Sequence, residues 1–277
     1  MNPVSRAVLT VTVAGILALA ASARVDAIKY GTLDGNAHPY VGLVVFDDAD
    51  GHTLWRCSGT LLSPRVFLTA GHCTEAPAAR ATIWFESNVV RNDPQFGYPS
   101  GGPTSHDGTP YTHPQYQPGA FYRYDLGVVV LDEPVAMSQY GALPALGLFD
   151  ALFTNRGPQL PAFTPVGYGL QFTNPAMTLS ALTRYQASVS IITGDSPFGG
   201  SSAFDFDDES VLFTNNASGG GTCFGDSGGP IFVGGTNVVA AVTSFGINQN
   251  CAGTGGGYRV DTADDLNWLL AAFGHLM

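Results

Sequence analysis

The sequence has little charge, and basic charge is especially scarce. Charged residues make up 12% of the 277 residues, with 11 Lys and Arg against 22 Asp and Glu, whereas globular chains commonly carry roughly 25%. A net charge of −11 disfavours contact with the phosphates of nucleic acids or with an anionic membrane surface. We therefore expect neither a nucleic-acid partner nor a membrane partner.

Several common motifs are missing. No C-x-x-C pair and no H-E-x-x-H helix occurs, which argues against a zinc site, and we expect no metal and no cofactor. Neither a βαβ alternation nor a repeat of roughly 20–50 residues is visible. The apolar run from Ala7 to Ala21 is shorter than the roughly 20 residues that a membrane-spanning helix needs.

That apolar run instead has the pattern of a secretory signal peptide. Arg6 supplies a positive charge before it, and two small-residue cleavage sites follow it. We expect a signal peptide over residues 1–27, or over residues 1–23 with a short pro-segment after it. The secreted domain is then expected to comprise residues 28–277.

Cysteine is also sparse, but its count is even. An even number of cysteines in an exported chain indicates disulfides. Sequence alone leaves the pairing open, and proximity along the chain favours Cys57 with Cys73 and Cys223 with Cys251.

What the chain does contain is a series of short β-type runs. They are separated by clusters of Gly, Pro, Asn and Asp, as many-stranded β folds require. The runs are Tyr40–Phe46, Cys57–Leu62, Val66–Thr69, Ala81–Phe85, Leu126–Leu131, Thr164–Tyr168, Tyr185–Ile192, Ile231–Val233 and Val238–Ser244. The fold class expected from this pattern is all-β.

Four longer segments complete the expected organisation. Residues 135–163 read as a connection between two β halves, and Asn92–Gly119 and Ser196–Gly221 as surface loops. One helix is expected over about residues 262–274, with Thr262 as its cap. Its apolar stripe would comprise Leu266, Leu269, Leu270 and Phe273.

Three segments carry residues suited to nucleophilic catalysis. Ser227 lies in the glycine-rich stretch Gly225–Pro230, where a tight turn can present backbone N–H groups to an oxyanion. A serine hydroxyl needs a base beside it, and His72 next to Cys73 is a candidate. Asp125 begins a strongly apolar strand, where an unpaired carboxylate would be unfavourable; an imidazole N–H is a suitable partner.

These segments resemble the triad blocks of the trypsin-like serine peptidases, which have the chymotrypsin fold, in the family's chain order of His, Asp, Ser. The resemblance covers nearly all of residues 28–277. It includes further segments at Pro39–Val41, His113–Tyr116, Val166–Gly169, Ser244–Gly246 and Tyr258–Val260, together with Trp268.

The resemblance implies two six-stranded antiparallel β-barrels, at about residues 28–140 and 160–260, followed by the C-terminal helix. It implies that Ser227 is the nucleophile, His72 the general base and Asp125 its partner. The N–H groups of Gly225 and Ser227 would form the oxyanion hole, and Ser244 would hydrogen-bond Asp125.

The same resemblance implies a secreted, monomeric endopeptidase that acts on protein or peptide substrates. The disulfide Cys57–Cys73 would fix His72, and the disulfide Cys223–Cys251 would brace the specificity pocket. Activation would pair a free amino group at Ile28 with Asp226, although Lys29 departs from the family's usual terminal block.

Substrate-binding residues follow from the same alignment. Gly221 would lie at the pocket floor, and Gly246 and Gly256 at its walls, with Ser244 and Phe245 on the strand that aligns the substrate. No aspartate stands at the floor position. We expect a neutral, open pocket that favours large apolar or aromatic side chains over Arg or Lys.

Two other readings remain. The stretch around Ser227 also satisfies G-x-S-x-G, the motif of α/β-hydrolase esterases, but that fold needs a parallel sheet and places its histidine after the serine. A non-catalytic binding protein on the peptidase fold is the second alternative, because a fold does not fix a function.

Overall fold

The structure, a computed structural model, describes residues 28–120, 122–153, 160–171, 182–193 and 209–277. The expected signal peptide lies outside these ranges. Within them, no helix combines the length and the apolar character needed to cross a bilayer.

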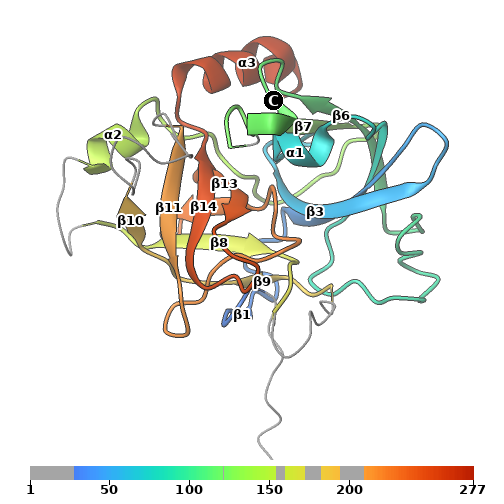
Figure 1. The fold of residues 1–277 in the computed structure, drawn as a ribbon. Coiled ribbons are helices and arrows are strands. Elements are labelled where there is room, and N and C mark those ends of the chain that lie inside the picture. Colours follow the sequence, from blue (N-terminus) through green and yellow to red (C-terminus); the bar gives the residue numbers. More distant parts are fainter. Residues whose placement is uncertain (1–27, 121, 154–159, 172–181, 194–208) are drawn as a thin grey trace, which may run out of the picture.

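The first half of the chain forms a closed antiparallel barrel, seen at the right of Figure 1, with the strand order β2-β3-β4-β7-β6-β5. Valine-rich runs such as Val41–Phe46 suit β structure because branched side chains pack well on a pleated surface. The strands are β2 (Val41–Asp47), β3 (Thr53–Leu61), β4 (Val66–Thr69), β5 (Arg80–Trp84), β6 (His106–Thr112) and β7 (Gly127–Leu131). This confirms the first predicted barrel.

The second half is an eight-stranded sheet with the order β1-β9-β8-β12-β13-β14-β11-β10. A six-stranded barrel was expected here; β1 instead extends one edge by pairing with β9, and β10 extends the other by pairing with β11. The strands are β1 (Thr32–Leu33), β8 (Phe163–Gly167), β9 (Tyr185–Gln186), β10 (Ile191–Thr193), β11 (Ser210–Asn215), β12 (Pro230–Val233), β13 (Val239–Gly246) and β14 (Gly253–Arg259).

Strand pairing separates the two hydrolase folds considered from the sequence. Neighbouring strands in both halves run antiparallel, for example β2 with β3 and β11 with β14. An α/β-hydrolase requires a parallel sheet with crossover helices. The described part of the chain therefore excludes the esterase fold.

Helices are short apart from the last one. They are α1 (Gly71–Thr74), α2 (Leu148–Phe153) and α3 (Ala263–Phe273), with 3-10 turns at Pro118–Ala120 and Gly274–Leu276. The predicted C-terminal helix is confirmed as α3. Its predicted stripe is only partly right, because Leu269 and Phe273 are buried whereas Leu270 is 56% exposed. Thr262 precedes the helix, and its hydroxyl donates to the Asp265 carboxylate rather than capping the backbone.

The buried side chain of Arg184 links the two halves. Its guanidinium donates to the carboxylate of Asp34 at 2.8 Å and to the carbonyls of Val41 and Phe85, both at 2.9 Å. Burial raises the pKa of Asp34, but the hydrogen bonds from His38 and Arg184 outweigh it, and the net shift is downward.

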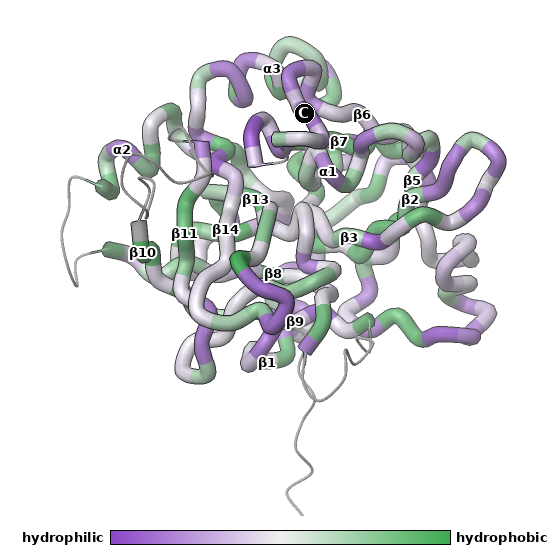
Figure 2. Tube along the Cα trace, in the orientation of Figure 1, coloured by the Kyte–Doolittle hydropathy of each residue, from purple (hydrophilic) through white to green (hydrophobic). Residues whose placement is uncertain are grey.

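Figure 2 shows the apolar strands of each half and the polar outer loops around them.

Candidate active site

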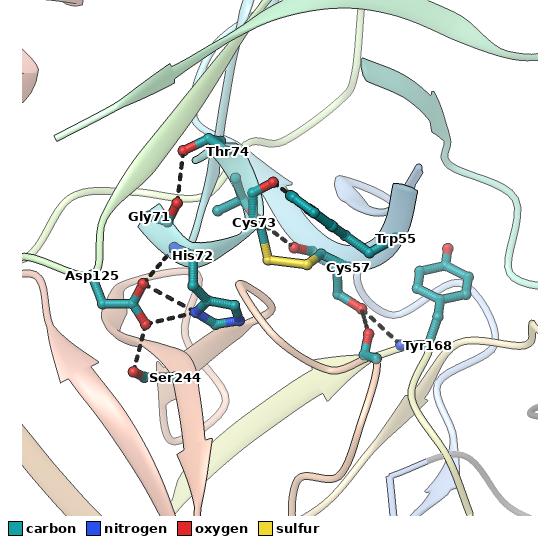
Figure 3. Close-up of a disulfide and its surroundings, with 12 residues drawn as sticks. Trp55, Cys57, Gly71, His72, Cys73, Thr74, Asp125, Tyr168 and Ser244 are labelled. Atoms are coloured by element: carbon teal, nitrogen blue, oxygen red, sulfur yellow. Dashed lines mark hydrogen bonds and ion pairs between the residues drawn. A yellow bond between two sulfur atoms is a disulfide. The ribbon is translucent and has the colours of Figure 1, made fainter. Parts of the chain in front are cut away.

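His72 and Asp125 form a pair in which the carboxylate is fully buried and the imidazole side chain is 23% exposed. The two oxygens of Asp125 lie 3.1 and 2.9 Å from Nδ1 of His72, and Oδ1 also accepts the backbone N–H of His72 at 2.8 Å. The hydroxyl of Ser244 donates to Oδ2 at 2.5 Å, as the resemblance implies. Figure 3 shows the imidazole lying between this carboxylate and the disulfide.

These contacts define what the imidazole can do. A carboxylate beside Nδ1 favours the tautomer with its proton on that nitrogen, which leaves Nε2 as a proton acceptor. Burial lowers the pKa of His72. The charge and hydrogen bond of Asp125 and the charge of Glu75 raise this pKa by more than burial lowers it, so the net shift is upward. The pair therefore has the arrangement of a base made stronger by its partner.

The local fold fixes each member of the pair. His72 lies on α1, directly after β4, and the Cys57–Cys73 disulfide ties α1 to β3. The indole N–H of Trp55 donates to the carbonyl of Cys73 at 2.8 Å. On the other side, Tyr124 has a φ of +51°, an unfavourable backbone conformation for a non-glycine residue, immediately before Asp125.

The loop that carries Ser227 lies against the segment that precedes His72. The carbonyl of Ser227 accepts the N–H of Ser58 at 2.8 Å. Gly228 has a φ of +74°, and a Cβ atom there would lie 2.0 Å from the hydroxyl of Thr69 and 2.7 Å from the N atom of Ala70. Only glycine permits this approach, which brings Ser227 to the His72 segment. In the described chain no hydrogen bond joins the Ser227 hydroxyl to His72.

Two N–H groups of this loop have no acceptor among the described residues. The carbonyl of Phe224 accepts the N–H of Leu170, and the carbonyl of Asp226 accepts the N–H of Gly229, both at 2.8 Å. In a trans peptide the N–H points away from the carbonyl of the same unit. The N–H groups of Gly225 and Ser227 therefore face away from those partners, and neither has an acceptor among the described residues.

Asp226 is fully buried behind Ser227. Its oxygens accept the N–H of Gly169 at 2.7 Å and the N–H of Cys223 at 2.9 Å. Burial raises its pKa to about 7, although these two bonds and the charge of Arg56 act in the opposite direction.

The segment expected to take part in activation lies beside the loop before Ser227. Ile28 is buried in an apolar cluster that includes Phe149 and Phe163. The carbonyl of the next residue, Lys29, accepts the N–H of Gly221 at 3.0 Å, and its ammonium group donates to the carbonyl of Asn250 at 2.5 Å. Among the described residues, the two predicted partners, Ile28 and Asp226, form no hydrogen bond or ion pair with each other.

A pocket of about 240 Å³ opens beside Ser227, and no charged residue is among the described residues that line it. The lining comprises Thr222, Cys223, Phe224, Ser227, Thr243, Ser244, Phe245, Gly246, Asn248 and Cys251. The second disulfide, Cys223–Cys251, forms part of the wall. Both disulfides thus pair as expected.

The predicted pocket glycines differ from one another. Gly246 is open, because the nearest atom to a Cβ there would be the carbonyl of Asn248 at 3.7 Å. Gly256 is covered by the ring of Phe245, at 2.3 Å from such a Cβ. Gly221 faces the side chain of Asn215, and its neighbour Thr222 lines the pocket instead.

Two groups of side chains have the spacing of metal ligands among the described residues. One consists of Cys57, His72 and Cys73, but both sulfurs are consumed by the disulfide. The other, Asp48 with Asp50 and His52, lies on an exposed turn. We assign a metal to neither group.

Sequence reasoning missed the residues that support the serine loop. The hydroxyl of Ser58 donates to the carbonyl of Gly225 at 2.9 Å and accepts the N–H of Tyr168 at 3.0 Å. Ser58 follows Cys57 in a motif already noted, but its function depends on contacts more than 100 positions away. Leu170, which holds the carbonyl of Phe224, has no signal in the sequence.

The chain was also compared with known proteins. The family model described as Trypsin matches residues 33–269. Brachyurin from Leptuca pugilator is 26% identical over 219 residues, which cover 78% of this chain and 84% of that protein. Chymotrypsin-like elastase family member 1 from Macaca fascicularis is 28% identical over 203 residues, which cover 70% of each chain.

A solved structure of HL collagenase has the same fold. It superimposes with a TM-score of 0.69 at 20% identity and covers 89% of this chain and 99% of that one. The family match spans far more than half of the sequence, and the observed architecture agrees with it. This chain belongs to the trypsin family of serine peptidases.

Proposed function

We propose that this chain is a secreted serine endopeptidase that hydrolyses peptide bonds in protein or peptide substrates. The observation that carries the proposal is the hydrogen-bonded pair of His72 and Asp125, oriented by Ser244, with the Ser227 loop packed against the same segment. An activated serine requires a base of this kind close to its hydroxyl.

In the proposed reaction Ser227 Oγ attacks the carbonyl carbon, and its proton passes to Nε2 of His72. Asp125 stabilises the resulting imidazolium. The negative oxygen of the tetrahedral intermediate accepts hydrogen bonds from the N–H groups of Gly225 and Ser227. The imidazolium then protonates the leaving amine, and water hydrolyses the acyl-enzyme by the same steps.

Secretion is part of the proposal. It is supported by the signal-peptide pattern of residues 1–27 and by the two disulfides, since disulfides form and persist in oxidising compartments. We propose a monomer, because an endopeptidase of this kind needs no second chain to complete its triad.

The proposed substrate preference is for an uncharged residue at P1, the position on the amino side of the cleaved bond. A charged P1 side chain would have to leave water without a partner, since no described residue that lines the pocket is charged. The disulfide Cys223–Cys251 and the strand Ser244–Gly246 border this pocket.

Active-site labelling tests the proposal directly. Secreted protein is treated with a fluorophosphonate, and the modified peptide is identified by mass spectrometry. We expect the adduct on Ser227 and its loss in a His72→Ala variant that retains the thermal unfolding of the parent. Folded protein that begins at Ile28 and remains unlabelled would contradict the proposal and favour a binding protein on the peptidase fold.

A further inference from the structure

The aromatic ring of Phe245 lines the pocket beside Ser227. It lies where glycine at position 256 was expected to leave the pocket open. Phe245 on β13 is paired with Gly256 on β14, and paired residues on neighbouring strands project to the same face of a sheet. The side chain of Phe245 and any side chain at position 256 would therefore compete for the same volume.

The ring occupies that volume. A Cβ atom on Gly256 would lie 2.3, 2.4 and 2.6 Å from Cζ, Cε2 and Cε1 of Phe245. These are the three atoms at the far end of the ring, so the ring extends fully across the glycine. Real Cβ atoms do not approach other atoms this closely, because interiors are packed at van der Waals distance.

The next glycine along β14 has the opposite surroundings. A Cβ atom on Gly257 would meet Ile231 and Phe213, both at 2.9 Å, which belong to the buried core of the second half. Successive residues of a strand point to opposite faces. Gly257 therefore faces the core, and Gly256 faces away from it, on the face where the ring of Phe245 lies. Phe245 is also one of the residues that line the pocket.

We propose that Phe245 closes the inner end of the P1 pocket, so that the enzyme cleaves after small aliphatic residues rather than after aromatic ones. The inference rests on the proposed function. It replaces the roomy pocket expected from Gly246 and Gly256, because only Gly246 leaves space at the wall. Gly256 serves to admit the ring of Phe245 and not the side chain of the substrate.

The side chain of Phe245 would therefore limit how large a P1 side chain the pocket can accept. A P1 phenyl group would have to displace the Phe245 ring, whereas a P1 alanine or valine side chain would lie beside it. Adding or removing one methylene in an apolar pocket changes discrimination by about 10- to 200-fold. A phenyl group that meets a ring is a larger mismatch, so a preference of at least about tenfold is expected.

The test uses two peptide substrates that differ only at P1, alanine or phenylalanine, with kcat/KM measured for each. We expect the wild-type enzyme to prefer alanine, and Phe245→Ala to raise the Phe/Ala ratio by about tenfold or more. Phe245→Leu should give an intermediate ratio. Adding Gly256→Thr to Phe245→Ala refills the same space and should restore the preference for alanine.

Phe224→Ala is the matched control, because Phe224 also lines the pocket but is 47% exposed at its mouth. It should change both substrates by a similar factor. Fluorophosphonate labelling of each variant tests the proposed peptidase function separately from the role of Phe245, because the reagent has no P1 side chain. Labelled wild-type enzyme that cleaves after phenylalanine as well as after alanine, or an unchanged ratio in labelled Phe245→Ala, would overturn the inference. Absence of labelling in every variant would instead refute the proposed function.

Discussion

Replacing Asp226 with asparagine measures how strongly this carboxyl group opposes folding once it is ionised. Asp226 has no exposed surface and lies beside the proposed nucleophile. Two backbone N–H groups contact it, but burial dominates and raises its pKa to about 7, from an ordinary value of 3.8. Asparagine keeps the shape of the protonated acid and cannot ionise.

The sign of the effect follows from proton binding. Between about pH 4 and about pH 7 the folded chain holds a proton at Asp226 that the unfolded chain has released, so stability falls as the pH rises through this range. A shift of about 3 pKa units corresponds to about 4 kcal/mol in the free energy of unfolding, and above about pH 7 the folded chain has lost this amount of stability. Asp226→Asn does not show this pH-dependent loss of stability. Its altered hydrogen bonding lowers the free energy of unfolding by about 1–3 kcal/mol at every pH.

The assay is urea unfolding followed by tryptophan fluorescence, at a series of pH values from about 4.5 to about 8.5. Both proteins carry Ser227→Ala to prevent self-cleavage and retain residues before Ile28. We expect Asp226→Asn to gain stability relative to the parent as the pH rises. Asp132→Asn, at an exposed position, is the control and should run parallel to the parent. A pH-independent difference for Asp226→Asn would refute the argument.

Three further predictions concern other contacts. Asp125→Asn should lower kcat by about 10⁴-fold and, because the charge of Asp125 helps to raise the pKa of His72, move the acid limb of any residual activity to lower pH. Arg184→Met leaves Asp34 buried without its main cation and should cost about 3–5 kcal/mol in urea unfolding; Arg184→Lys should recover part of the loss. Lys29→Met removes a hydrogen bond to the carbonyl of Asn250, next to the pocket residue Cys251, and should reduce stability by about 1 kcal/mol, measured by thermal unfolding, with a larger effect on KM than on kcat.

Most strands with a clear apolar run were predictable from the sequence, whereas strands inside long segments rich in Gly, Pro and Asp were not. The run Val41–Phe46 needs only its branched side chains to indicate β2. In contrast, β6 and β11 lie in segments expected to be loops, and β6 contains both a glycine and a proline. They become strands because neighbours on both sides supply hydrogen bonds, as β5 and β7 do for β6.

The candidate site divides in the same way. The residues of the proposed triad and the cysteines of both disulfides lie in short motifs that can be read directly from the sequence, and both disulfides pair as predicted. The ring of Phe245 across Gly256 depends on strand register and a side-chain rotamer, neither of which a motif contains. The buried hydrogen bonds of Arg184 similarly join it to Gly35 and to Val41, about 150 positions away, and only the three-dimensional packing reveals them.

The two buried carboxylates beside the proposed nucleophile differ in what balances their charge. Asp125 contacts an imidazole, a hydroxyl and a backbone N–H, whereas Asp226 contacts two backbone N–H groups and has Arg56 as the cation that lowers its pKa. An α-amino group at Ile28 would add the missing positive charge, because the ammonium group of the neighbouring Lys29 donates to the carbonyl of Asn250 instead.

This difference predicts that the pH dependence of stability differs between protein that begins at Ile28 and protein that retains the residues before it. In protein that begins at Ile28, pairing with the amine should lower the pKa of Asp226 and remove most of its stability loss between about pH 4 and about pH 7. Above about pH 8 the amine loses its proton, and both stability and activity should fall. Protein that retains residues 24–27 should keep the original slope. Urea unfolding of the two forms, each with and without Asp226→Asn, measures the coupling, and equal slopes in both forms would show that Ile28 is not the partner of Asp226.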